Sequence, residues 1–70
     1  MAVAAWAAST AFSVGDIRRA TTEQPSGLFF RCSTAGTSAS SEPGWPNMVG
    51  DTVTDGTCVW TGIASAYEEL

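Results

Sequence analysis

Turn-forming residues interrupt this chain at short and regular intervals, and this spacing restricts its fold more than any other feature. Apolar runs are broken about every eight to twelve residues by Gly, Pro, Asp or Ser, a pattern typical of short strands joined by turns. Helical periodicity is nearly absent from the middle of the chain. The sequence therefore predicts an all-β fold, either a small antiparallel β-sheet or a compact sandwich or barrel-like module, with one long polar loop.

The strongest strand signal is the run Leu-Phe-Phe-Arg-Cys that begins at Leu28. Because side chains alternate between the two faces of a strand, Leu28, Phe30 and Cys32 share one face. Phe29 and Arg31 point to the opposite face. We expect the first face to be core, which places Phe29 either over a second small core or in an exposed contact surface beside Arg31.

The clearest hairpin signal lies near the end of the chain, where residues 52–54 and 57–60 flank an Asp-Gly pair. Asp-Gly is favoured at the centre of two-residue type I′ turns, because both positions need positive φ. A turn centred on this pair places Val53 opposite Cys58. Trp60 then points inward on the same face as these two residues.

The remaining segments of the chain are assigned around these two elements. We divide it into an N-terminal arm, a β module and a C-terminal tail, which cover residues 1–9, 10–62 and 63–70. Within the module we expect a first strand over 16–20, introduced by a Val-Gly turn, and a second turn over 24–27. Residues 33–46 form the long polar loop, whose far end is held to the body by Trp45. The tail is expected to be a short helical turn or a frayed end.

Length and charge exclude several classes of function. Seventy residues make one small domain, whose core supplies no more than about 3–5 kcal/mol, so we expect help from self-association, a disulfide or a partner. The formal net charge is −4, with three arginines, no lysine and no histidine. Nucleic-acid binding depends on Lys and Arg contacts to phosphates, and histidine is the commonest general base and metal ligand. We therefore expect no nucleic-acid partner, no cofactor, no metal and no enzymatic activity.

The apolar N-terminus does not predict a membrane segment or an export signal. Its run of alanines around Trp6 is far shorter than the roughly 18–20 residues that span a bilayer. It also has no basic region before the apolar run, as a signal peptide would have. We expect no membrane partner and interpret the run as part of the mature fold.

The two cysteines, Cys32 and Cys58, have no histidine companion and no close Cys pair, which excludes a zinc site. Both are expected to point into one core from neighbouring strands. A disulfide between them would add about 3–4 kcal/mol by loop-closure arithmetic. The alternative is a pair of buried reduced thiols that behave as small hydrophobic side chains, and the sequence leaves both open.

Large aromatic side chains are the remaining candidates for a binding surface. Trp60 points inward in the expected register and is assigned to the core. The candidate residues for contact with a partner or a second copy are Trp6, Phe29, Arg31 and Trp45, since aromatic and Arg side chains dominate interface hot spots. For Trp6 and Trp45 a place in the core is the alternative, because a small domain needs large apolar groups.

Two segments of the chain carry a family resemblance. The first consists of Trp6, Ala11-Phe12, Val14-Gly15-Asp16-Ile17 and Gly27-Leu28-Phe29-Phe30-Arg31-Cys32. It resembles the small chitin- and cellulose-binding modules appended to bacterial glycosidases. The second and more specific segment consists of residues 32–38, 41–46 and 50–60, with several Gly, Pro and Trp residues at set spacings. It resembles a module of tailed-phage structural proteins, which include head fibres, decoration (cement) proteins and tail-fibre segments. The chain departs from the usual pattern at Arg18 and Cys58.

The resemblance implies a function as well as a β-rich fold. The chain has a start methionine and little beyond the module, so we expect a free-standing capsid decoration or cement protein rather than an enzyme's appendage. It would bind the major capsid protein on the outer surface of a bacteriophage head and stabilise the shell. It would be made in the host cytoplasm and located on the virion. Self-association is expected as well, for example as a trimer, and surface glycans are a further candidate partner.

The alternative function is a carbohydrate-binding module, free or within a phage fibre. It would recognise polysaccharide by stacking on a strip of exposed aromatic residues drawn from Trp6, Phe29, Trp45 and Tyr67. A tail or baseplate component built on the same module is a third interpretation.

Overall fold

The chain folds into strands and irregular segments. The computed structural model describes residues 3–22 and 27–64, and within these ranges it contains no helix, which confirms the all-β prediction. The strands are β1 (Ala11–Phe12), β2 (Ile17–Arg18), β3 (Phe29–Thr34), β4 (Gly36–Thr37), β5 (Thr52–Asp55) and β6 (Cys58–Ile63). Most of the turn expected over 24–27 and most of the tail expected over 63–70 lie outside the described residues.

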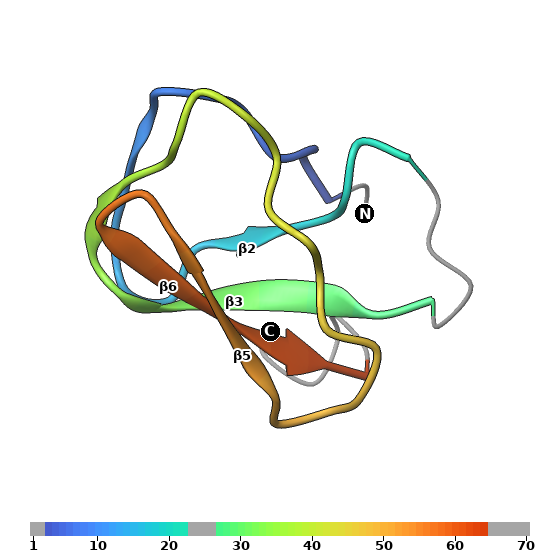
Figure 1. The fold of residues 1–70 in the computed structure, drawn as a ribbon. Helices are drawn as coiled ribbons and strands as arrows, with labels where there is room; N and C mark the ends of the chain where they lie inside the picture. Colours follow the sequence, from blue (N-terminus) through green and yellow to red (C-terminus); the bar gives the residue numbers. More distant parts are fainter. Residues whose placement is uncertain (1–2, 23–26, 65–70) are drawn as a thin grey trace.

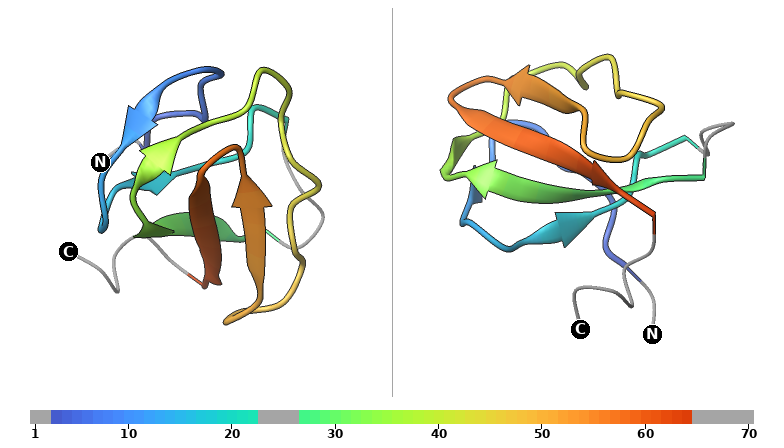
Figure 2. Two further views of the ribbon diagram at one scale, coloured as in Figure 1. Left: turned by 60° about the vertical axis from the view of Figure 1, so that its left-hand side comes forward. Right: turned by 90° about the horizontal axis from the view of Figure 1, so that it is seen from below.

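The strands form two antiparallel sheets. β2, β3, β6 and β5 lie side by side in that order, while β1 pairs with β4 in a separate two-stranded sheet (Figure 1). Figure 2 shows the four-stranded sheet strongly twisted, with the β1–β4 pair and the long irregular segment before β5 beside it. The first predicted strand, over 16–20, is present as β2 and is preceded by the expected Val-Gly turn. That turn is closed by a hydrogen bond from Asp16 N to Ser13 O at 3.0 Å.

The central strand β3 confirms the predicted alternation and corrects one boundary. Phe30 and Cys32 are fully buried, whereas Phe29 and Arg31 on the opposite face are half-buried. The polar loop expected over 33–46 begins later than predicted, because β3 continues to its sixth residue and β4 follows at once. Ser, Thr and Gly in that stretch are compatible with strand pairing once β1 and β6 supply partners, which local composition does not reveal.

The hairpin of β5 and β6 is present, but its register differs from the predicted one. Asp55 pairs with Cys58, and Val53 pairs with Trp60 rather than with Cys58. The turn is therefore centred on Gly-Thr and not on Asp-Gly. Gly56 has a φ of +62°, and the threonine after it does not have positive φ, as in a type II′ turn with Gly in first position. The register moves by two residues, so the inward set is unchanged, but Asp55 becomes the last strand residue and also points inward.

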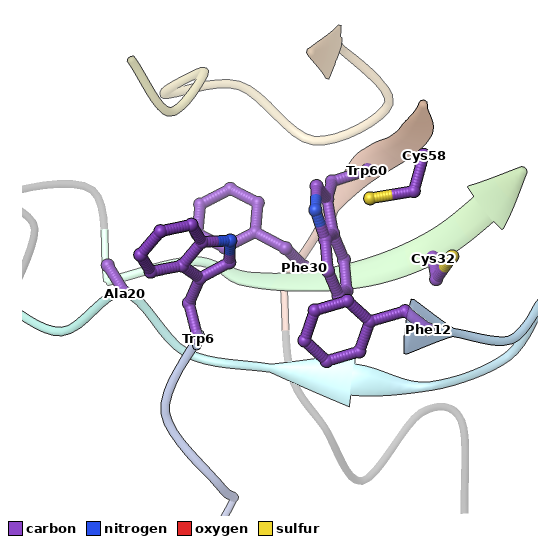
Figure 3. Packing of buried hydrophobic residues seen from close by; sticks show 7 residues of the cluster. All are labelled: Trp6, Phe12, Ala20, Phe30, Cys32, Cys58 and Trp60. Carbon is purple, nitrogen blue, oxygen red and sulfur yellow. The ribbon is translucent and has the colours of Figure 1, made fainter. Parts of the chain in front are cut away.

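The core lies on the inner face of the four-stranded sheet. Buried residues from the N-terminal segment, β1, β3 and β6 form it together with Ala20: Trp6, Phe12, Ala20, Phe30, Cys32, Cys58 and Trp60 (Figure 3). The ring centre of Phe12 lies 4.9 Å from that of Trp60 in an edge-to-face contact. Such pairs contribute about 0.5–1.5 kcal/mol beyond the area they bury. The guanidinium of Arg18 lies over the Phe12 ring, 5.1 Å from its centre.

Two glycines let β4 pass directly against the hairpin tip. A Cβ atom at Gly36 would overlap the backbone carbonyl of Thr57, and one at Gly56 would overlap the backbone carbonyl of Thr37. Thr57 N also donates a hydrogen bond to Thr37 O at 3.0 Å. The two sheets are therefore joined backbone to backbone at this point, which closes one end of the core.

Candidate functional site

The four predicted contact residues do not share one surface. Trp6 and Trp45 lie on the inner face of the four-stranded sheet, whereas Phe29 and Arg31 lie on the outer face. Only 8% of the Trp6 surface is exposed, so this residue offers little area to a ligand. The structure therefore divides the predicted set into a pair that builds the fold and a pair that faces outward.

The outer face is built from residues that pair directly across the strands. One row crosses all four strands, because Ile17 pairs with Arg31, Arg31 with Thr61, and Thr61 with Thr52. Residues directly opposite each other in a sheet point to the same side. The first three side chains of this row are half-buried and Thr52 is exposed. This row joins an aliphatic group, a guanidinium and two hydroxyls on one side of the sheet.

Further apolar and hydroxyl groups flank that row. Phe29 lies opposite Ile63 on one side of it, and Thr54 lies opposite Val59 on the other. Ser33 lies at a β-bulge, where its Oγ atom accepts a hydrogen bond from Thr61 Oγ1 at 3.0 Å. These residues together with the row are called the outer face below: Ile17, Phe29, Arg31, Ser33, Thr52, Thr54, Val59, Thr61 and Ile63. Arg31 is its one charged side chain in the part of the chain that the structure describes.

A buried carboxylate occupies the inner side of the same sheet. Asp55 is 1% exposed and accepts hydrogen bonds from the indole nitrogens of Trp6 at 2.8 Å and Trp60 at 2.9 Å. The backbone nitrogen of Ala39 donates to its other oxygen at 3.0 Å. Asp55 therefore joins the N-terminal segment, the loop after β4 and the hairpin. Its oxygens are occupied by groups of the fold itself.

The role of Asp55 was not predicted, because the expected register placed this residue in the turn. A type II′ turn over Gly56-Thr57 was also compatible with the sequence. It would have placed Asp55 in phase with Val53 on the inward face of the strand. The partners of Asp55 could not have been predicted in this way, since Trp6 is 49 positions away along the chain.

A second carboxylate holds Trp45 in place. The Trp45 ring stacks on Phe30, with ring centres 4.2 Å apart, and its indole nitrogen donates to Glu42 Oε2 at 2.8 Å. Thr21 donates to the same carboxylate from its backbone nitrogen at 2.9 Å and from its hydroxyl. Partial burial raises the pKa of Glu42, but the hydrogen bonds from Thr21 and Trp45 outweigh burial, so the pKa lies below its ordinary value. The expected attachment of the loop by Trp45 is thus part of the fold.

Both cysteines are buried free thiols in the structure. Cys58 Sγ lies 3.0 Å from Asp55 O, and Cys32 Sγ lies 3.2 Å from Thr34 O. Burial raises the pKa of Cys58 to about 11, and the charge of Asp55 adds to the effect. Burial also raises the pKa of Cys32. Raised thiol pKa values and burial make both groups poor nucleophiles at neutral pH.

Over residues 3–22 and 27–64, no three His, Cys, Asp or Glu side chains lie close enough to hold a metal ion. Over the same ranges, no helix has the length and apolar character needed to cross a bilayer. Tyr67, a candidate for the aromatic strip, lies outside the described residues.

No protein-family model, curated protein or solved structure matches the chain.

Proposed function

We propose that the chain is a structural virion protein, a capsid decoration or cement protein that binds the major capsid protein of a phage head through the outer face. The observation that carries this proposal is the composition of that face. It combines half-buried Ile17, Phe29 and Val59 with hydroxyl groups and a single charged side chain, Arg31. Interface centres are depleted in charged residues other than Arg and enriched in aromatic residues.

The mechanism is structural. Copies seated between capsid subunits bury apolar area across the junction, so that more free energy is needed to pull the shell apart. Two large apolar side chains before β5 are also exposed, Met48 at 65% and Val49 at 61%. The resemblance of residues 32–38, 41–46 and 50–60 to the phage module supports the same assignment.

Heating purified capsids with and without the bound protein tests the proposal. We expect the decorated shells to disrupt at a higher temperature and the protein to sediment with them. Disruption at equal temperatures, with no protein on the shell, would overturn the proposal.

A matched pair of charge substitutions tests the surface itself. Thr52→Glu adds a carboxylate to the exposed end of the outer-face row, whereas Ser40→Glu adds the same charge to an exposed loop residue. Because a like or unpaired charge at an interface costs affinity, Thr52→Glu is expected to weaken capsid binding about tenfold or more. Ser40→Glu is expected to bind as the unsubstituted protein does. Equal binding of the two variants would place the contact elsewhere on the molecule.

Carbohydrate binding receives less support from the geometry. The strip of exposed aromatics would be drawn from Trp6, Phe29, Trp45 and Tyr67. Trp6 is buried, Phe29 and Trp45 lie on opposite faces of the sheet, and Tyr67 lies outside the described residues. Titration with chitin or cellulose oligosaccharides, followed by tryptophan fluorescence, distinguishes the two functions. A saturable change in fluorescence would favour the carbohydrate-binding module.

A further inference from the structure

The N-terminal segment, residues 3–9, lies beside the four-stranded sheet and forms a single β-bridge just past β2. It runs parallel to the end of β2 through a bridge between Ala5 and Arg19. Trp6 N donates to Arg19 O at 2.8 Å, and Arg19 N donates to Ala4 O at 3.0 Å. We call this segment the arm. Its backbone pairs with the N–H and carbonyl of Arg19, directly after β2.

One side chain anchors the arm in the core. Trp6 inserts between the sheets beside Phe30 and Trp60 (Figure 3), and its indole nitrogen reaches the buried carboxylate of Asp55. A second attachment lies further along the arm, where Ser38 Oγ donates to Ala7 O at 2.7 Å. The arm is therefore a short peptide held by one large aromatic side chain and a few backbone hydrogen bonds. Any copy of this chain offers the same receptor for it.

The arm joins the body through a strained residue. Ser9 has a φ of +50°, and it is the one residue other than glycine with positive φ among those that the structure describes. The left-handed region is costly for a residue with a Cβ atom and is held only when surrounding contacts demand it. Here Ser9 N donates to Ala39 O at 3.1 Å, and Thr10 follows directly into hydrogen bonds with Ser38. The strain is thus confined to the position where the arm turns back onto its own body.

We propose that the arm exchanges between two copies of this chain, so that each copy seats its Trp6 in the partner's core. The contacts of the arm with a body are the same within one chain and between two chains. The closed and exchanged forms therefore differ in the turn at Ser9, which relaxes when the arm extends, and in the entropy of association. Exchange of an identical element is a low-cost route to a dimer. This inference goes beyond the proposed function and does not depend on a capsid.

Substitutions at the turn test the role of strain. Ser9→Gly removes the cost of positive φ from the closed form, and Ser9→Val increases it, because a β-branched residue tolerates this region poorly. After refolding at a series of concentrations, we expect Ser9→Gly to raise the dimer dissociation constant about ten- to thirtyfold, since two turns contribute to each dimer. Ser9→Val is expected to lower it by a similar factor. Sedimentation velocity measures the dimer fraction, and Ser40→Gly and Ser40→Val are the matched controls at an exposed serine with ordinary φ.

A crosslinking experiment separates arm exchange from any other dimer. Ala5→Cys and Arg19→Cys are made in separate full-length chains, which are mixed, refolded together and oxidised. Bridge partners are close enough for a disulfide, and the native cysteines are buried. A disulfide between the two introduced thiols then forms only where the arm of one chain lies on the body of the other. We expect this mixed dimer, identified by mass, to increase with protein concentration and with Ser9→Val.

Two results would overturn the proposal. One is a monomer at every concentration for the unsubstituted chain and for Ser9→Val. The other is a dimer that forms without the mixed disulfide, which would show that the copies associate through another surface.

Discussion

The two faces of the four-stranded sheet differ in what their side chains are bonded to. On the inner face, fully buried Phe30, Cys32 and Trp60 pack against aromatic rings from other segments, and Asp55 is saturated by donors of the fold. On the outer face, Ile17 and Arg31 pair across the strands and stay half-buried. The inner face therefore supplies most of the buried core, whereas the side chains of the outer face, apart from buried Ile63, are half-buried or exposed. The positions of aromatic residues do not by themselves indicate an outward-facing surface, since most of those described are used to build the inner face.

The strongest test of this difference removes the buried carboxylate. Asp55→Ala leaves the indole nitrogens of Trp6 and Trp60 and the backbone nitrogen of Ala39 without their acceptor. Each unsatisfied buried donor costs about 1–3 kcal/mol, so we expect a loss of about 4 kcal/mol. A loss of that size would unfold most of the chain at room temperature, given the small core.

Urea denaturation followed by circular dichroism measures this loss. Asp51→Ala is the matched control, because Asp51 is an exposed carboxylate just before β5. Equal free energies of unfolding for the two variants would show that Asp55 is not the centre of the inner face.

A pair of identical substitutions on adjacent residues compares the faces directly. Phe30→Leu changes the shape of a fully buried ring position that stacks on Trp45, and we expect it to cost about 1.5 kcal/mol. Phe29→Leu alters a half-buried position on the outer face, and its expected cost is about 0.5 kcal/mol or less. Denaturation midpoints give the stabilities, and sedimentation with capsids gives the affinities. The comparison fails if Phe29→Leu destabilises the protein more than Phe30→Leu does.

The inner face is also expected to respond to alkaline pH. Because burial raises the pKa of Cys58 to about 11, the folded chain holds this proton at pH values where an unfolded thiol has lost it. The folded state therefore binds more protons between about pH 9 and pH 11, and its stability falls as the pH rises through that range. The contribution of the Cys58 proton to stability is complete at pH values below the pKa of the thiol in the unfolded chain. It is lost once the pH exceeds the pKa of the thiol in the folded chain.

Unfolding free energies measured across this range in the unsubstituted protein and in Cys58→Ala check the prediction. The decline is expected to be shallower in the variant, because one of the two buried thiols is absent. Identical slopes would show that Cys58 does not contribute to the alkaline loss of stability.

Local sequence patterns predicted the elements of the sheet but not all of their boundaries. The alternation from Phe29 to Cys32 gave the correct faces of β3, since side-chain direction in a strand depends only on position. The Asp-Gly pair correctly indicated the hairpin but placed its turn one residue too early. β4 was missed because Gly36 and Thr37 have no strand signal of their own and become a strand through pairing with β1.

The candidate site was predicted in part, for the same reason. Phe29 and Arg31 could be placed together on one face because they belong to one strand. Trp6 and Trp45 could not be assigned, because an aromatic residue between small or turn-forming neighbours fits an exposed strip as well as a core. Their positions depend on Asp55 and Glu42, which receive their indole hydrogen bonds.

The sequence by itself determined that this chain is an all-β domain with an inward and an outward set of side chains along β3, β5 and β6. These properties follow from alternation and turn chemistry, which act between near neighbours. Only the tertiary structure decided that Asp55 is the buried centre of the inner face, that Trp6 belongs to the core, and that Ser9 carries the turn of the arm. Each of these depends on segments that meet only after folding, where a hydrogen bond or a strained φ is held by groups far away in the chain.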